Sequence, residues 1–129
     1  MKKNMSLVKI LAVDDERTIL NSLCRFFVEA GCIFVAADSG TEGLSVLQHA
    51  STFDVIISDY RMPGMNGIEF LAAARELQPE SFRILLTGMA PGKDIVAAIK
   101  SGTISAYVPK PWDNNQLLDL IENLISEKQ

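Results

Sequence analysis

Short apolar runs alternate along this chain with longer stretches in which apolar residues recur at helical spacing. The runs cover residues 9–13, 33–36, 55–58, 83–86 and 106–108. Runs of this length, bounded by turn-forming residues, are typical of buried strands in a parallel sheet. The last helical stretch has apolar residues at positions 117, 118, 121, 124 and 125, which share one helical face. The pattern therefore predicts five strands, each followed by a helix.

Capping signals indicate where several of these helices begin and end. Ser39 is expected to cap the second helix, and Asn66 with Glu69 has the spacing of a capping box for the third. The fourth helix is predicted near residues 94–100, and Gly102 is expected to end it. No linker or repeat interrupts the alternation of strands and helices.

Five strand–helix units fit a single doubly wound α/β domain, because right-handed crossovers leave few ways to connect them. We predict a five-stranded parallel sheet in the order 2-1-3-4-5. The 129 residues suit one domain over residues 1–129, with an ordered core at about residues 7–127. That order places the first and third strands side by side at a topological switch point, where ligands of such sheets bind.

Polar residues follow four of the five runs, at the point where each run ends. Asp14 and Asp15 follow the first run, Asp59 the third, Thr87 the fourth, and Lys110 lies just past the fifth. Because parallel strands all direct their carboxyl ends to one edge, these side chains are expected to meet there. Each residue alone has an ordinary explanation, such as a helix cap or a solvated lysine.

Three carboxylates at one edge repel one another, and the cost rises if they are partly buried. A hard divalent cation offsets this repulsion, and Mg²⁺ suits best because it binds carboxylates and phosphate oxygens together. Asp59 then has two possible roles, as a metal ligand or as a nucleophile that accepts a phosphoryl group. Lys110 and Thr87 are chemically suited to hold phosphoryl oxygens.

Composition narrows the classes of partner. The chain carries a formal net charge of −4, with 48% hydrophobic and 22% charged residues. This balance argues against direct nucleic-acid binding, which needs a basic face. The apolar runs are far shorter than the roughly 20 residues of a membrane span. We expect a cytoplasmic location and no membrane association.

Four motifs in fixed order carry a family resemblance: LAVDDE, DVIISDYRMPGMNGIEFL, ILLTG and AYVPKPW. With them, the chain resembles a response regulator receiver domain of two-component signalling, similar to chemotaxis regulators, over essentially its full length. The resemblance implies a flavodoxin-like (βα)5 fold. It also implies that Asp59 accepts a phosphoryl group from a sensor histidine kinase or a phosphotransfer protein.

The same resemblance assigns a metal site and a conformational switch. Asp15, Asp59 and the backbone carbonyl of Arg61 would ligate Mg²⁺ directly, and Asp14 would act largely through bound water. Lys110 and Thr87 would contact the phosphoryl group, and Thr87 and Tyr107 would form the switch. Arg61 and Met89 would tune the phosphoryl lifetime, and the Lys110-Pro111 peptide bond would be cis.

As such a domain, the protein would be a signalling switch and not a turnover enzyme, apart from catalysing its own phosphorylation and dephosphorylation. Its partners would include an output domain or a downstream protein, and a phosphorylation-dependent dimer is possible. The output surface is expected on the fourth helix, fifth strand and fifth helix. Our candidates on it are Lys100, Ile104 and Tyr107.

Three other functions remain to be weighed. A phosphohydrolase in the style of haloacid dehalogenases would use Asp14 and Thr18, but its motif needs a second aspartate where Glu16 stands. An FMN-binding domain of the same architecture would need a phosphate loop after the first strand, where the acidic residues would repel phosphate. A docking module with an inactive site would not need these convergent residues.

Overall fold

The computed structural model describes residues 7–50, 52–88 and 92–128. Five strands and five helices alternate through these ranges. The strands are β1 (Lys9–Val13), β2 (Ile33–Ala37), β3 (Val55–Asp59), β4 (Phe82–Thr87) and β5 (Ala106–Pro109). The helices are α1 (Arg17–Glu29), α2 (Gly40–His49), α3 (Gly67–Leu77), α4 (Lys93–Ser101) and α5 (Asn114–Lys128).

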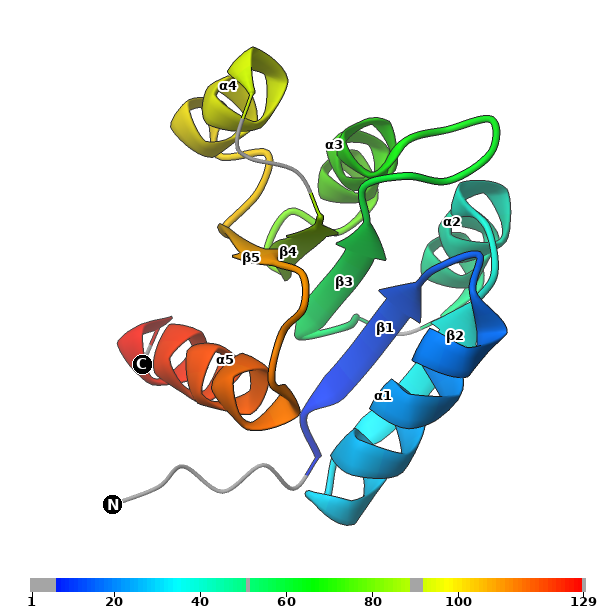
Figure 1. The fold of residues 1–129 in the computed structure, drawn as a ribbon, viewed down its shortest axis with the longest axis vertical. Helices are drawn as coiled ribbons and strands as arrows, with labels where there is room; N and C mark the ends of the chain where they lie inside the picture. Colours follow the sequence, from blue (N-terminus) through cyan, green and yellow to red (C-terminus); the bar gives the residue numbers. More distant parts are fainter. Residues whose placement is uncertain (1–6, 51, 89–91, 129) are drawn as a thin grey trace.

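All strand pairs are parallel, and the sheet order is β2-β1-β3-β4-β5. This confirms the predicted fold class and strand order. Figure 1 shows α1 and α5 on one side of the sheet and α2, α3 and α4 on the other. Two apolar cores fill these two interfaces, and the buried strand residues alternate between them, as Ile10 and Leu11 do in β1.

The helix signals are confirmed where the sequence marked them. The Ser39 side chain accepts a hydrogen bond from the Glu42 amide, and Asn66 and Glu69 form a complete capping box. Gly102 ends α4 in the left-handed conformation, with φ of 81°. Within the described ranges, none of the helices is long and apolar enough to cross a membrane.

Two sequence expectations need correction. Four strands extend beyond the predicted runs, so that Asp59 and Thr87 are the last residues of β3 and β4 and remain within the hydrogen-bonded ladder. Ile104, proposed as a surface residue, is only 2% exposed and packs in the core beneath α4. Its amide donates to the Ala98 carbonyl, which turns this segment inward after the helix ends. The exposed large apolar side chains of α4 are Val96 and Ile99.

Candidate functional site

Three carboxylates meet at the carboxyl edge of the sheet, where β1 and β3 are neighbours. One oxygen each of Asp14, Asp15 and Asp59 lies within 4.8 Å of the others. Asp14 and Asp59 are buried, at 2% and 4% exposure, while Asp15 is exposed. The topology explains this convergence, because β1 and β3 pair in register up to Val13 and Ser58.

Asp14 is held rigidly and carries an unsatisfied oxygen. Its Oδ1 accepts a hydrogen bond of 2.8 Å from the Glu16 amide, and its own amide donates to the Ala37 carbonyl. Its Oδ2 is buried and has no hydrogen-bond partner among the described residues. Burial is the main cause that raises the pKa of Asp14 to about 6, and the negative charge of Asp59 adds to it. A buried carboxylate oxygen of this kind would be satisfied by a cation or by a hydrogen-bond donor.

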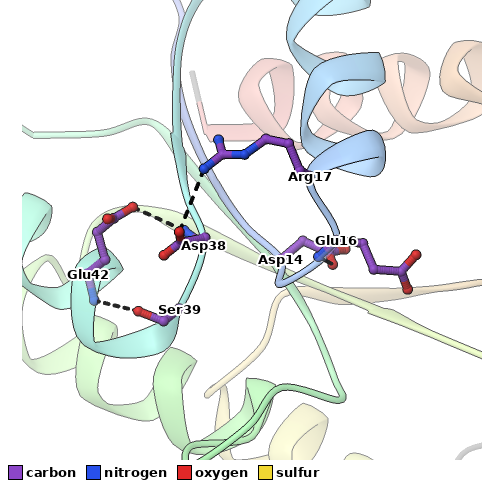
Figure 2. Close-up of polar contacts among 6 residues, drawn as sticks. All are labelled: Asp14, Glu16, Arg17, Asp38, Ser39 and Glu42. Carbon is purple, nitrogen blue, oxygen red and sulfur yellow. Dashed lines mark hydrogen bonds and ion pairs between the residues drawn. The ribbon is translucent and has the colours of Figure 1, made fainter.

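Figure 2 shows this carboxylate together with charged and polar groups at the starts of α1 and α2. Arg17 forms an exposed ion pair of 3.6 Å with Asp38, and the Asp38 amide donates to the Glu42 side chain. These contacts fix the two loops that follow β1 and β2. Arg17 is directed toward Asp38 and away from Asp14 in this view, so it does not neutralise the cluster.

Lys110 supplies the positive charge of the site. Its Nζ lies 2.5 Å from Asp59 Oδ1, and the lysine side chain is 27% exposed. The Lys110 amide donates to the Thr87 carbonyl, which ties the β5–α5 loop to the end of β4. The Lys110-Pro111 peptide bond is cis, as the resemblance implied. The Lys110 Nζ also lies 6.0 Å from the centre of the Trp112 ring.

A small pocket of about 280 Å³ opens over Asp59. Its lining includes Thr87, which is almost completely buried, and both Gly88 and Lys110. Tyr107 pairs with Leu85 in the β4–β5 ladder and is partly buried against the core that α4 covers. The pocket therefore joins the acceptor carboxylate, a hydroxyl and an ammonium in one space large enough for a phosphoryl group.

Arg61 lines this pocket and a second, open one of about 550 Å³. Asp15, Met62, Pro63 and Asn66 also line that second pocket, so the β3–α3 loop extends the acidic site outward. Met89, which the resemblance linked to phosphoryl lifetime, lies outside the described residues.

Two features of the site were missed at the level of sequence. A Cβ on Gly67 would collide with the Asp59 carbonyl oxygen, and the Gly67 amide donates to the Tyr60 carbonyl. Glycine is therefore required for α3 to begin directly beneath the acceptor residue. The hydroxyl of Tyr60 donates to the Asp94 carboxylate at the start of α4. The need for glycine at position 67 has a sequence signal in the Asn66-Gly67 pair. The contact between Tyr60 and Asp94 has no local sequence signal.

The donor set fits a hard divalent cation. Within the part of the chain that the structure describes, three residues offer carboxylate oxygens, Oδ2 of Asp14 is buried without a partner, and Lys110 pairs with Asp59. Such cations prefer oxygen ligands, and they stabilise the ionised form of neighbouring acids. The arrangement thus combines a cation-binding edge with a nucleophilic carboxylate and groups that bind phosphoryl oxygens.

Known proteins share this fold and sequence pattern. A model of the response regulator receiver domain family matches residues 10–122. The hydrogenase transcriptional regulatory protein HoxA of Cupriavidus necator is 32% identical over 116 residues, covering 90% of this chain and 24% of the relative. A CheY-like response regulator receiver domain protein from Methanospirillum hungatei is 32% identical, with a TM-score of 0.88 over 95% of this chain and 96% of that chain.

A third similar structure is a response regulator protein from Burkholderia pseudomallei, solved with a phosphorylated aspartic acid, a calcium ion and citrate. It is 27% identical, with a TM-score of 0.81 over 94% of this chain and 70% of that chain.

The chain belongs to the response regulator receiver domain family of two-component signalling. It spans about a quarter of the length of the curated relatives, which include the DNA-binding transcriptional regulator NtrC of Salmonella typhimurium. This family membership gives no support to the phosphohydrolase alternative.

Proposed function

We propose that Asp59 is the phosphoacceptor of this receiver domain. The carrying observation is the 2.5 Å contact of Lys110 with Asp59, inside a pocket that also contains Thr87. One Asp59 oxygen would attack phosphorus, the P–N bond of a phosphohistidine would break, and the departing electron pair would return to the imidazole, which takes up a proton. Lys110 would neutralise the transferred phosphoryl group, and Thr87 would donate a hydrogen bond to it.

The acidic cluster is proposed to hold Mg²⁺. Asp15, Asp59 and the Arg61 carbonyl would bind it directly, and Asp14 through water. When bound, the cation would neutralise charge that develops on the phosphoryl oxygens. The buried, unpartnered Oδ2 of Asp14 supports this proposal, because a cation or its water would satisfy that oxygen. The Burkholderia relative, which holds a phosphorylated aspartate and a calcium ion in one structure, supports it by analogy.

Phosphorylation is proposed to act on the α4-β5-α5 face through Thr87 and Tyr107. Tyr107 lies in β5, and Thr87 ends β4, which pairs with β5. Lys100, Val96 and Ile99 of α4 are exposed on this face. A new dianionic group at Asp59 would favour the arrangement in which Thr87 approaches it. Phosphoryl lifetime would depend on the side chains at positions 61 and 89.

The wider assignment is drawn from the family. A histidine kinase or phosphotransfer protein would be the phosphoryl donor, and an output domain or separate protein would respond to the switched face. We propose a cytoplasmic domain whose folded unit covers about residues 7–127, which acts as a switch and not as a turnover enzyme. Phosphorylation-dependent dimerisation through the same face is part of this proposal.

The test is incubation of the whole chain with acetyl phosphate and Mg²⁺, followed by intact-mass measurement. We expect a mass gain of one phosphate in the wild type, none in Asp59→Asn, and a retained gain in Asp54→Asn. Asp54 is an exposed aspartate at the opposite end of β3 and is the matched control. An unchanged gain in Asp59→Asn would contradict the proposal. Phosphate release over many turnovers that depends on Asp14 would support the hydrolase instead.

A further inference from the structure

The two ends of α4 are attached to the domain in different ways. At its carboxyl end, Arg75 donates to the Ser101 carbonyl at 2.9 Å, and Arg83 donates to the carbonyls of Gly102 and Thr103 at 3.0 and 2.8 Å. Arg83 itself is buried within β4. Two guanidinium groups therefore clamp the end of the helix and the turn that follows it.

The amino end of α4 has a single side-chain tether. Within the described ranges, the hydrogen bond from Tyr60 to Asp94 is the one side-chain hydrogen bond that joins the first half of α4 to another element. Asp94 also accepts from the Ile95 amide within its own helix. Ile95 of this half also packs in the apolar core, and such packing is not directional and tolerates a small shift.

Tyr60 is a rigid support because its backbone is held on both sides. Its amide donates to the Leu86 carbonyl, and its carbonyl accepts from the Gly67 amide. It directly follows Asp59 in sequence, so the tether starts at the residue next to the acceptor. The hydrogen bond to Asp94 raises the pKa of the Tyr60 phenol, as a carboxylate acceptor does when it stabilises the protonated form.

We propose that the Tyr60–Asp94 hydrogen bond is a latch that holds the amino end of α4 in the unphosphorylated position, with the arginine-clamped carboxyl end as the pivot. The inference rests on the proposed function of Asp59. Thr87 ends β4 and the next regular element, α4, begins at Lys93, so movement of Thr87 toward a phosphoryl group would be accompanied by movement of the latched end. The latch opposes that movement, and Tyr60 and Asp94 act as positioning residues for α4.

The first test measures amide hydrogen exchange by NMR in the whole, unphosphorylated chain. Tyr60→Phe keeps the ring and removes the hydroxyl, and we expect exchange of the Val96 and Ala97 amides to accelerate about two- to tenfold. The amides of Ser101 and Gly102 should not change. The mirror control, Arg75→Ala, should accelerate the second pair and leave the first pair unchanged. Equal acceleration along the whole helix in Tyr60→Phe, or none, would overturn the latch.

A double-mutant cycle assigns the effect to the pair. Asp94→Ala should accelerate the Val96 and Ala97 amides, and adding Tyr60→Phe to it should have little further effect. Fully additive effects of the two substitutions would show that the residues act independently, and the latch would then be wrong.

The second test links the latch to the acceptor site. Beryllium fluoride with Mg²⁺ mimics an aspartyl phosphate, and its affinity is measured by ¹⁹F NMR. A latch that favours the unphosphorylated state predicts that Tyr60→Phe binds it about two- to tenfold more tightly than the wild type. If Tyr60→Phe and the wild type bind beryllium fluoride with equal affinity, the hydrogen bond is only a local surface contact and the latch is wrong, even if amide exchange is faster in the variant. Absence of binding to either protein would overturn the proposed function, and the inference with it.

Discussion

Both edges of the sheet bury polar side chains, but they differ in how these are paired: among the described residues, the one buried side-chain oxygen or nitrogen without a hydrogen-bond partner is Asp14 Oδ2, at the carboxyl edge. At the amino edge, the Arg83 guanidinium donates to four backbone carbonyls, those of Pro79, Ser81, Gly102 and Thr103. Nearby, the buried Gln78 side chain accepts from the Phe53 amide and donates to the Leu47 carbonyl. These groups bind together the chain segments that enter and leave the sheet.

At the carboxyl edge, three carboxylates face one lysine, and an oxygen of Asp14 has no partner among the described residues. Burial raises the pKa of Asp14 to about 6, so the fold opposes its ionisation. A polar cluster that is complete contributes to stability, whereas one that is incomplete reduces stability until a ligand binds. The difference distinguishes a structural network from a functional site within one sheet.

The largest effect is expected at the amino edge. Arg83→Met would leave buried carbonyls without donors, and we expect it to lower the free energy of unfolding by about 4 kcal/mol. Urea denaturation measures this change. The exposed Arg25 on α1 is the control, and Arg25→Met should change stability by less than about 0.5 kcal/mol. Similar small effects of both substitutions would remove the distinction between the edges.

At the carboxyl edge, stability should fall as pH rises, because Asp14 is buried and its pKa is higher in the folded than in the unfolded chain. The folded chain keeps this proton between about pH 4 and pH 6, so the associated stability is complete below pH 4 and lost above pH 6. In metal-free buffer, Asp14→Asn should gain stability relative to the wild type by up to about 3 kcal/mol across this window. Parallel curves for the two proteins would contradict the assignment.

A cation bound at the carboxyl edge should restore the stability that is lost when Asp14 ionises, and substitutions at the amino edge should not change this effect. At ten times its dissociation constant, Mg²⁺ should raise the free energy of unfolding at pH 7 by about 1.4 kcal/mol. Asp15→Asn should weaken this response, and Asp54→Asn at the amino edge should keep it. Equal responses in the two variants, measured by urea denaturation, would place the cation elsewhere.

The smallest signal is spectroscopic. Trp112 lies near Lys110, and its Nε1 donates to the Asn114 side chain, which holds the ring in place. Cation binding that redistributes charge around Asp59 should move Lys110 and change the fluorescence of this single tryptophan. A constant emission at millimolar Mg²⁺ would count against a cation next to Asp59.

The fold was predictable because its signals are local. Apolar runs and caps marked the elements, and the right-handed crossover rule left few strand orders; the order chosen among them, which the structure confirms, brings Asp14 and Asp59 to one edge. The strand ends were less predictable, since Asp59 and Thr87 stay in the ladder through backbone pairing that any residue supports. The prediction from sequence ended each strand at its last apolar run, so it placed Asp59 and Thr87 just outside β3 and β4.

Contacts between distant segments were not predictable from the pattern. Tyr60 and Asp94 are 34 positions apart, and no sequence motif includes both residues. Arg83 begins an apolar run, and its partners are backbone carbonyls, which leave no mark in the sequence. Ile104 was wrongly placed on the surface because the inward turn after Gly102 is a tertiary feature.

The most direct test of the central claim, that Asp59 is the acceptor at an edge completed by a cation, is to locate the acyl phosphate. Borohydride converts an aspartyl phosphate to homoserine, and peptide mass spectrometry identifies the position. After treatment with acetyl phosphate, we expect homoserine at position 59, in Mg²⁺ but not in chelator. Homoserine at position 14 or 15, or equal conversion of Asp59 without a divalent cation, would contradict the account.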